Sequence, residues 1–521
     1  GSAMDGMRKC LAEEFSKIYV FNLRGNCRTS GEVRKKEAGN VFGPGSRTPI
    51  AVTILVKNPS HKGPAEIRYH DIGDYLSREE KLDILAQRHD LHNPELVWHK
   101  LEANSAGDWL NQRDPSFQSF LALGDKKDRE NICTFFKPCF SNGLKTNRDH
   151  WCYNFSVSKL RNNIKKTIDF YNNQVNNIDK LKLSLKEVDI SKELDLDSRK
   201  FSWDYQQKID VVRSKRYKFS DQSIYTGLYR PFTKQNVYFN RQLNNRVYLL
   251  PDLFPTQDHE NLIICLSGIG VTKEFSTIIT NVIPDVQLQF NGQCFPRYHY
   301  EINNNQNGGS NSDQVIGDYI RHDAITDYIL QICKNKYSIK ITKDDIFYYI
   351  YGLLHSADYR RAFSADLKKT RPRLPLVERF DDFKAFSKAG RDLAGIHLNY
   401  EGAKAYGRVS LTGVEKGNFK VEKARFRSKI DKSIIYFNQD ITISGIPLEA
   451  YDYVVNGRSP IEWVLERYQV KTDPSSGLKN DPNDWGQERG QPRYILDLIL
   501  RVITVSLETV KIVQGLPKLS F

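Results

Sequence analysis

Short apolar runs separated by polar connections mark the N-terminal part of the chain. Continuous apolar runs of this kind are typical of buried strands, and three of them predict strands at 18–23, 50–56 and 67–70. A second type of pattern, helix-like, covers residues 7–15. Another helix is expected from Ser77, because Glu80 stands three residues later and completes a capping box. This region therefore indicates the end of an α/β sheet domain.

Farther along the chain, apolar positions recur with the spacing of helices. Helices are expected at 156–174, 342–351, 359–369, 460–468 and 494–513. A strand is expected at 434–443, and the low-complexity stretch 303–313 predicts a mobile loop. The last helix carries charged residues along its length, which indicates an amphipathic core helix and argues against a membrane span.

Composition indicates a soluble globular protein with a polyanionic partner. The chain has 521 residues, with 77 Lys and Arg against 63 Asp and Glu, a net charge of +14 and a pI near 9.1. Length alone suggests roughly three domains. The basic balance favours nucleic acid first and an anionic membrane second. Eight cysteines occur without a C-x-x-C pair, which predicts reduced cytoplasmic thiols and no zinc site.

A long basic connection joins the first two predicted strands. Five glycines lie between Gly25 and Gly45, and the cations outnumber Glu32 and Glu37. The cations are Arg24, Arg28, Arg34, Lys35, Lys36 and Arg47. Compact domains rarely keep such a connection without a use for it, so we expect it to contact phosphates.

Residues 140–151 are the second candidate segment for nucleic-acid contact. The segment groups Asn142, Lys145, Asn147 and Arg148 around Gly143. Glycine can adopt a positive φ, so the backbone is expected to fold back and present these side chains together. Asn, Lys and Arg are residue types that bind phosphate oxygens and base edges. The alternative is a solvated turn before the next helix.

Residues 213–246 are the third candidate, with eight cations against one acid, Asp221. The cations include Arg216, Arg230, Lys234 and Arg241, and seven aromatic residues lie among them. Cations release counterions from nucleic acid, and aromatic rings stack on bases. The alternative is a hairpin whose aromatic residues face the core while its charges face water.

Signals for catalysis are weak. Residues 267–270, Ser-Gly-Ile-Gly, follow an apolar run and precede a helix-like segment, as in loops that bind a nucleotide or S-adenosylmethionine, but the motif lacks a third glycine. Asp71, Asp74, Glu79 and Lys81 imitate a metal-nuclease pattern, although the last two fall in a predicted helical turn. The sequence contains no P-loop motif and no Pro-Pro pair.

Several blocks of sequence resemble Type ISP restriction–modification enzymes. They cover residues 18–26, 28–32, 229–232, 349–356, 359–361, 366–375 and 463–471. The resemblance extends over almost the whole chain. It implies a mixed α/β (α+β) fold in which the end of an N6-adenine methyltransferase sheet is followed by a DNA target-recognition domain and a helix-rich C-terminal region.

The same resemblance implies an organisation and a partner. Residues 1–3 read as a cloning scar, 4–130 as the end of the methyltransferase, 131–335 as the first part of the recognition domain and 336–521 as its helical part. The expected partners are double-stranded DNA and upstream methyltransferase, helicase and nuclease domains of one bacterial, cytoplasmic chain. S-adenosylmethionine, ATP and Mg²⁺ are expected in the parent enzyme and not in this fragment, which should read DNA without modifying it.

Residue roles also follow from the resemblance. Phe42 matches the aromatic that packs beside a flipped adenine, and residues 140–151 resemble the block that opens the recognition domain. Two other functions stay open at this point. The chain could be an autonomous methyltransferase that uses Gly268 and Gly270, or an RNA-binding protein whose aromatic residues stack on single strands.

Overall fold

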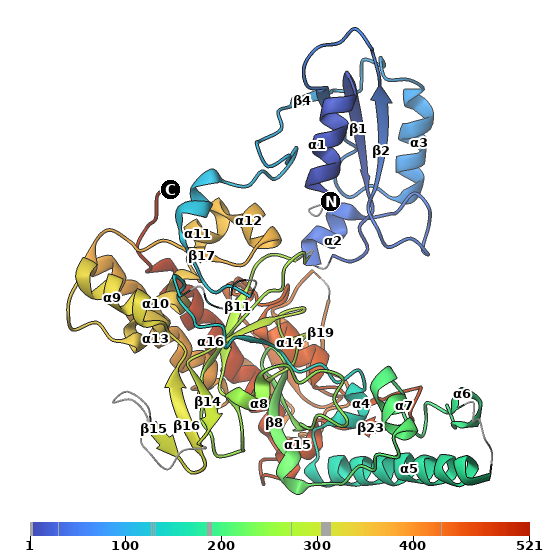
Figure 1. Ribbon diagram of the computed structural model, residues 1–521, viewed down its shortest axis with the longest axis vertical. Coiled ribbons are helices and arrows are strands. Elements are labelled where there is room, and N and C mark those ends of the chain that lie inside the picture. Colours follow the sequence, from blue (N-terminus) through green and yellow to red (C-terminus); the bar gives the residue numbers. More distant parts are fainter. Residues whose placement is uncertain are drawn as a thin grey trace.

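The computed structural model describes the chain except residues 1–3, 30, 127, 129, 131, 185–189, 272, 304–313 and 429. The expected cloning scar and most of the expected loop at 303–313 lie outside the described residues. Figure 1 shows a smaller N-terminal lobe, drawn in blue at the top, and a larger body below it. The segment after β4 (His99–Leu101) leads from the lobe into the body.

The N-terminal lobe is a four-stranded mixed sheet flanked by helices. Its order is β2–β1–β3–β4, with β1 antiparallel to β2 and parallel to β3. The elements are α1 (Asp5–Glu14), β1 (Lys17–Arg24), α2 (Gly31–Glu37), β2 (Ile50–Val56), β3 (Glu66–Asp71) and α3 (Arg78–Arg88). The predicted strands and helices are confirmed, and Ser77 and Glu80 form the predicted capping box at the start of α3. Helix α2 was not predicted.

One buried carboxylate joins the lobe to the body. Asp108 accepts a hydrogen bond of 3.1 Å from Arg8 of α1 and one of 2.8 Å from Arg113. It also accepts one from Lys369, at the end of α12 (Ser364–Lys369). Burial opposes ionisation, but these cations hold the pKa of Asp108 well below its usual value. The lobe is therefore fixed to the body by charge.

Several small sheets build the body. One has the order β11–β10–β13–β6, and a second has the order β12–β8–β9–β7. Their strands are β6 (Ser141–Asn142), β7 (Tyr153–Asn154), β8 (Ile224–Arg230), β9 (Thr233–Tyr238), β10 (Ile263–Leu266), β11 (Thr277–Thr280), β12 (Ile283–Pro284) and β13 (Gln293–Pro296). The other sheets contain β5 (Leu121–Ala122), β14 (Tyr298–Ile302), β15 (Gln314–Ile316), β16 (Tyr319–Asp323), β17 (Arg373–Leu374), β18 (Ser410–Thr412), β19 (Arg425–Phe426), β20 (Ile434–Tyr436), β21 (Thr442–Ser444), β22 (Lys471–Thr472) and β23 (Lys479–Asn480).

Helices surround these sheets, and α16 runs through the middle of the body (Figure 1). The helices that precede the C-terminal half are α4 (Asp149–Cys152), α5 (Val157–Ser184), α6 (Ile190–Glu193), α7 (Tyr205–Val212) and α8 (Leu250–Leu253). The later helices are α9 (Asp327–Lys336), α10 (Lys343–Leu353), α11 (Ala357–Ala362), α12, α13 (Phe380–Leu398), α14 (Pro460–Arg467), α15 (Asn483–Gln487) and α16 (Tyr494–Gln514). Among the described residues, no helix is both long and apolar enough to cross a membrane.

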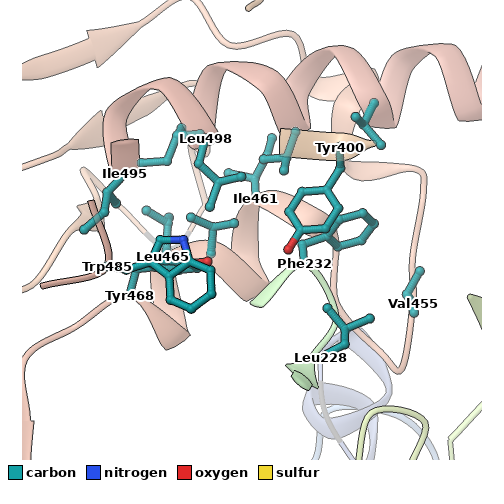
Figure 2. Packing of buried hydrophobic residues seen from close by; sticks show 14 of the residues in the cluster. Leu228, Phe232, Tyr400, Val455, Ile461, Leu465, Tyr468, Trp485, Ile495 and Leu498 are labelled. Atoms are coloured by element: carbon teal, nitrogen blue, oxygen red, sulfur yellow. The ribbon is translucent and has the colours of Figure 1, made fainter. Parts of the chain in front are cut away.

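Two large cores of the body mix early and late parts of the sequence. In one, Phe232 from the turn between β8 and β9 packs with Tyr400 beneath α16 (Figure 2). In the other, Phe295 of β13 shares a cluster with residues of α10 and α13. Because each core draws side chains from both sides of position 335, the boundary expected there does not separate two cores.

Most predicted helices are confirmed, but the body also differs from the predictions. The helix expected at 359–369 is two short helices, α11 and α12, and the strand expected at 434–443 is the hairpin of β20 and β21. Helix α5 continues to Ser184, beyond the predicted end at 174. Helix α13 was not predicted, although its buried Phe383, Phe386 and Leu393 have helical spacing.

Candidate nucleic-acid interface

The basic connection between β1 and β2 is anchored at its base and exposed at its tip. Asn40 is buried, and its side-chain amide donates hydrogen bonds to the carbonyls of Gly25 (3.1 Å) and Thr48 (2.8 Å). Gly25 has φ +87°, and a Cβ there would lie 2.9 Å from the Asn40 Cα. The two ends of the connection are thus held together, and the residues between them project as one unit.

A buried lysine supports the same base. Lys81 Nζ donates to the carbonyl of Glu37 at 2.9 Å and to that of Gly39 at 2.7 Å. Burial lowers the pKa of this amine. Lys81 therefore caps the end of α2. This placement contradicts the metal-nuclease pattern, because Lys81 is turned to backbone carbonyls.

The cations of this connection have two different surroundings. Arg24 forms ion pairs with Asp71 (2.6 Å) and Asp74, and Lys36 lies 3.6 Å from the same Asp74. Arg28, Lys35 and Arg47 are exposed. Arg24 thus holds the connection against β3, and its assignment to DNA stays a prediction.

Phe42 is the most unusual side chain of the lobe. It is 74% exposed, although it sits in the turn that follows the buried Asn40 and Val41. Its backbone N–H donates to the Asn40 side chain at 3.0 Å, so the turn itself is fixed while the ring lies in solvent. Helix α2 lies at the end of the lobe nearest the body (Figure 1).

Residues 140–151 alternate between buried and exposed side chains. Phe140, Leu144 and Trp151 are buried, whereas Lys145 and Asn147 are exposed. The turn was expected at Gly143, which is wrong, because the positive φ (+56°) belongs to Asn147. Gly143 is required for close packing instead, since a Cβ there would lie 2.6 Å from the carbonyl carbon of Asp285.

Arg148 is buried and fully engaged, so the expectation that it reads DNA is corrected. Its Nε and Nη2 donate to the Ser202 carbonyl at 3.1 and 2.9 Å, and Nη1 donates to the Leu243 carbonyl. Nη2 also donates to Asp204 (3.1 Å) and Gln207 (2.8 Å). This guanidinium satisfies carbonyls that would otherwise be buried without partners.

An open cavity of about 400 Å³ lies beside the exposed part of this segment. Its lining includes Lys145, Asn147 and His150 on one side and Gln287 on another. Lys145 pairs with Arg246 through backbone hydrogen bonds of 3.0 and 2.9 Å, which sets a second exposed cation next to it. Sequence reasoning missed Arg246 as a partner of Lys145, because the two are far apart in the chain.

A buried ionic cluster lies beneath this surface. Arg230 donates to Asp285 at 2.8 Å, lies 3.7 Å from Asp149 and stacks on the Tyr229 ring with its Cζ 3.9 Å from the centroid. Tyr153 donates its hydroxyl to Asp285 at 3.1 Å. Burial raises the pKa of Asp285 to about 7. Arg230 therefore holds the sheet to residues 145–149 and is mostly buried.

Most of the aromatic residues of 213–246 face the core, as the alternative interpretation of this segment expected. Strands β8 and β9 form a hairpin, and Tyr217, Phe232, Tyr238 and Phe239 are buried. They have no face available for stacking on bases.

Three further cations of this stretch were assigned to DNA. Lys234 is mostly buried and lies 2.6 Å from Glu401. Arg216 is half-exposed and pairs with Asp179 at 3.1 Å. Arg241 is exposed, and it lines another cavity, of about 720 Å³. In the third candidate segment, Arg241 and Arg246 are exposed.

Asn142 lies at the edge of this surface. It is half-buried, accepts a hydrogen bond of 2.9 Å from Lys126 Nζ, and donates one of 3.3 Å to the Gly292 carbonyl. Asn142 thus connects residues 140–147 to the turn that precedes β13. This turn also carries exposed side chains that the sequence analysis did not select.

Residues 267–270 do not have the surroundings that a cofactor-binding loop requires. After residues 267–270 the chain enters β11, antiparallel to β10, and no helix follows. A Cβ at Gly268 would lie 2.5 Å from the Asn291 carbonyl oxygen, so this glycine is required for packing. The prediction of a helix after this loop is wrong, and the residues do not fit S-adenosylmethionine. Within the described part of the chain, no group of three His, Cys, Asp or Glu side chains could hold a metal ion.

Comparisons with known proteins agree on one family. The family model of the Type ISP C-terminal specificity domain matches residues 135–498. No curated protein matches the chain. Solved structures do, beginning with a nuclease-deletion mutant of the Type ISP restriction–modification enzyme LlaGI in complex with a DNA substrate mimic, at 36% identity and a TM-score of 0.84 over 99% of this chain.

Two other structures are similar over the same length. The ATP-dependent Type ISP enzyme LlaBIII bound to DNA has 34% identity and a TM-score of 0.84 over 100% of this chain, and the DrdV–DNA complex has 28% and 0.81 over 99%. The chain spans 45%, 32% and 49% of the LlaGI, LlaBIII and DrdV chains, respectively. It therefore corresponds to less than half of each relative.

Proposed function

The chain belongs to the Type ISP restriction–modification family, whose C-terminal specificity domain it contains, and we propose that it binds duplex DNA at a specific sequence. In this proposal the body reads the sequence and the N-terminal lobe holds DNA near a target adenine. In this proposal, other parts of a parent chain carry the nuclease, helicase and methyl-transfer activities. Those parts also bind ATP, Mg²⁺ and S-adenosylmethionine.

One observation carries the proposal for the body. Residues 140–151 are buried along one side, yet they keep Lys145 and Asn147 in solvent, beside Arg246 and next to a cavity. Arg and Lys pair with guanine, and Asn pairs with adenine, through the major groove. Because the buried side chains fix the backbone, these polar groups are preorganised to meet base edges, which reduces the entropic cost of recognition.

The N-terminal lobe supports a second part of the proposal. Its edge strand β2 exposes Val52, Ile54, Leu55 and Val56, and among the described residues its outer edge has no partner strand. An open apolar edge of this kind is a template for further strands. We infer that the sheet continues with upstream methyltransferase strands and that Phe42 forms part of the wall of a pocket for a flipped adenine.

Binding of duplex libraries tests the function directly. The full chain is incubated with a duplex library that carries a randomised core, and bound sequences are recovered and amplified. We expect one sequence to be enriched. Affinity for that duplex should fall by orders of magnitude between about 50 and about 200 mM salt, as expected for several phosphate contacts.

Variants separate sequence reading from phosphate contact. Asn147→Ala should weaken binding to the selected duplex by about 1–3 kcal/mol and should change binding to scrambled DNA little. Lys35→Ala should weaken binding to both duplexes alike, and it should reduce the slope of log affinity against log salt concentration by about one. Recovery of random sequences, or tighter binding of single-stranded RNA than of duplex DNA, would overturn the proposal.

A further inference from the structure

The turn that connects β12 to β13 has an unusual backbone. Phe290 and Asn291 have φ values of +52° and +55°, so two consecutive residues other than glycine are left-handed. Positive φ values are strongly preferred by Gly and, among the other residues, by Asn. Asn291 fits this preference, but Phe290 does not.

Phe290 is disfavoured in this position in two ways. Its Cβ makes the left-handed region costly, and its ring is 40% exposed. Gly or Asn in the same place would relieve the strain and remove the exposed apolar surface. Strained backbone of this kind occurs at functional sites, where the surrounding structure holds it.

The surrounding structure holds this turn firmly. Asn456 is buried, and its amide donates to the carbonyls of Gln287 (3.2 Å) and Leu288 (3.1 Å). The Gly268 N–H donates to the Phe290 carbonyl at 3.3 Å. Ile269, next to Gly268, is 45% exposed, so a second apolar side chain lies on the loop that touches the turn.

The turn lies within the surface assigned to DNA. The Leu144 N–H donates to the Pro284 carbonyl at 2.7 Å, and the Val286 N–H donates to the Leu144 carbonyl at 2.9 Å, so residues 284–292 run beside residues 141–145. Asn142 binds the Gly292 carbonyl and also accepts from Lys126. On the other side, Arg371 donates to Gln293 at 2.8 Å. Lys126 is thus linked through Asn142 to Gly292, and Arg371 binds the next residue, so two cations lie at the end of the turn, which favours a polyanion over an apolar protein partner.

We propose that Phe290 is a wedge that inserts at a base step of the bound duplex. This inference rests on the proposed function, because it names how the same surface distorts its DNA. Apolar side chains that unstack a base step kink the duplex and make specificity depend on how easily that step deforms. The rigid turn keeps the ring in position before DNA arrives, and Ile269 widens the apolar tip.

The test compares Phe290→Gly and Phe290→Ala with the unaltered chain, on the duplex recovered by selection. The control is Tyr205→Ala, which removes another exposed aromatic residue of the body, 80% exposed on α7. We expect both Phe290 variants to bind roughly tenfold or more weakly, and Tyr205→Ala to bind normally. A 2-aminopurine placed in turn at each step should brighten at one step with the unaltered chain and stay quenched with Phe290→Gly.

Stability distinguishes the wedge from an ordinary packing residue. Because glycine adopts a positive φ without strain, Phe290→Gly should raise the midpoint of thermal unfolding or leave it unchanged while binding is lost. Normal affinity and an unchanged 2-aminopurine signal in both variants would overturn the wedge and leave the proposed function standing. Failure of the unaltered chain to select any duplex would overturn both.

Discussion

Residues 24–49 and residues 213–246 are both rich in cations, and both contain aromatic residues, but the structure uses them differently. In the first stretch the aromatic residue, Phe42, lies in solvent. In the second, most of the aromatic residues are buried, and Arg230 and Lys234 form ion pairs beneath the surface. Composition therefore indicates which residues are available for a surface but not which of them are at the surface.

The difference follows from the elements that carry the two stretches. The first is a connection outside the sheet of the lobe, and only its base touches the core, through Asn40 and Lys81. The second is a hairpin whose strands lie in the middle of a four-stranded sheet. Its side chains face neighbouring elements on both sides, so long cations there must pair with carboxylates to be buried.

The largest expected effect comes from breaking the buried ion pairs of the hairpin. Arg230→Ala leaves Asp285 buried without its cation, which should lower the free energy of unfolding by about 3–5 kcal/mol. Arg241→Ala, on the same stretch but exposed, should change it by less than about 0.5 kcal/mol. Urea denaturation of both variants measures the difference. Equal stabilities would mean that the two cations have similar surroundings, contrary to the structure.

As the pH falls, the core around the hairpin should lose stability before the lobe does. His397 lies edge to face with Phe232 and is hydrogen-bonded to Tyr351 (2.6 Å) and Thr509 (2.9 Å). Burial lowers the pKa of His397 to about 3. The unfolded chain binds a proton below its own pKa of about 6.5, so the stability contributed by neutral His397 is complete above that pH and is lost as pH falls toward about 3.

The expected loss is on the order of a few kcal/mol. Urea midpoints between about pH 7 and about pH 4 measure it. His397→Gln should flatten the dependence, whereas His150→Gln, at an exposed position, should not. The same slope in all three proteins would show that acid acts elsewhere.

A smaller effect is expected where the body needs close packing. Gly143→Ala puts a Cβ against the backbone of Asp285, and overpacking of this kind costs about 1–3 kcal/mol. Gly407→Ala is the matched control, because nothing lies within 4 Å of a Cβ there. Thermal unfolding of the two variants compares them. Normal stability of Gly143→Ala would show that the contact can relax without cost.

The smallest effect on stability is expected in the exposed connection. Phe42→Ala should change the free energy of unfolding by less than about 0.5 kcal/mol, because the ring makes little contact. It should also leave the DNA binding of this chain nearly unchanged. In a longer parent chain it should lower adenine methylation, measured by incorporation of labelled methyl groups. Loss of stability would show that Phe42 belongs to the core, and unchanged methylation would remove it from the pocket.

Sequence reasoning located most elements because their signals are local. The capping boxes at Ser77 and Thr342 mark real helix starts, and the runs at 18–23 and 50–56 are strands. Helix α13 was missed because small and charged residues interrupt its apolar stripe, and Gly390 sits where a Cβ would clash with the Tyr348 carbonyl. That glycine permits close packing of α13 on α10, a reason that no local pattern contains.

By itself, the sequence determined the family, the basic character of the chain and the segments from which a nucleic-acid surface could be built. Only the tertiary structure decided which side chains of those segments reach solvent. Arg148 looked as well suited to DNA as Lys145, but Ser202, Leu243 and Gln207 surround it. Phe290 gave no signal, because its turn is held by distant residues: Asn456 binds the Leu288 carbonyl, and Gly268 binds the Phe290 carbonyl. Exposure depends on residues distant in sequence, and the energy of burying a charge or straining a backbone depends on those same partners.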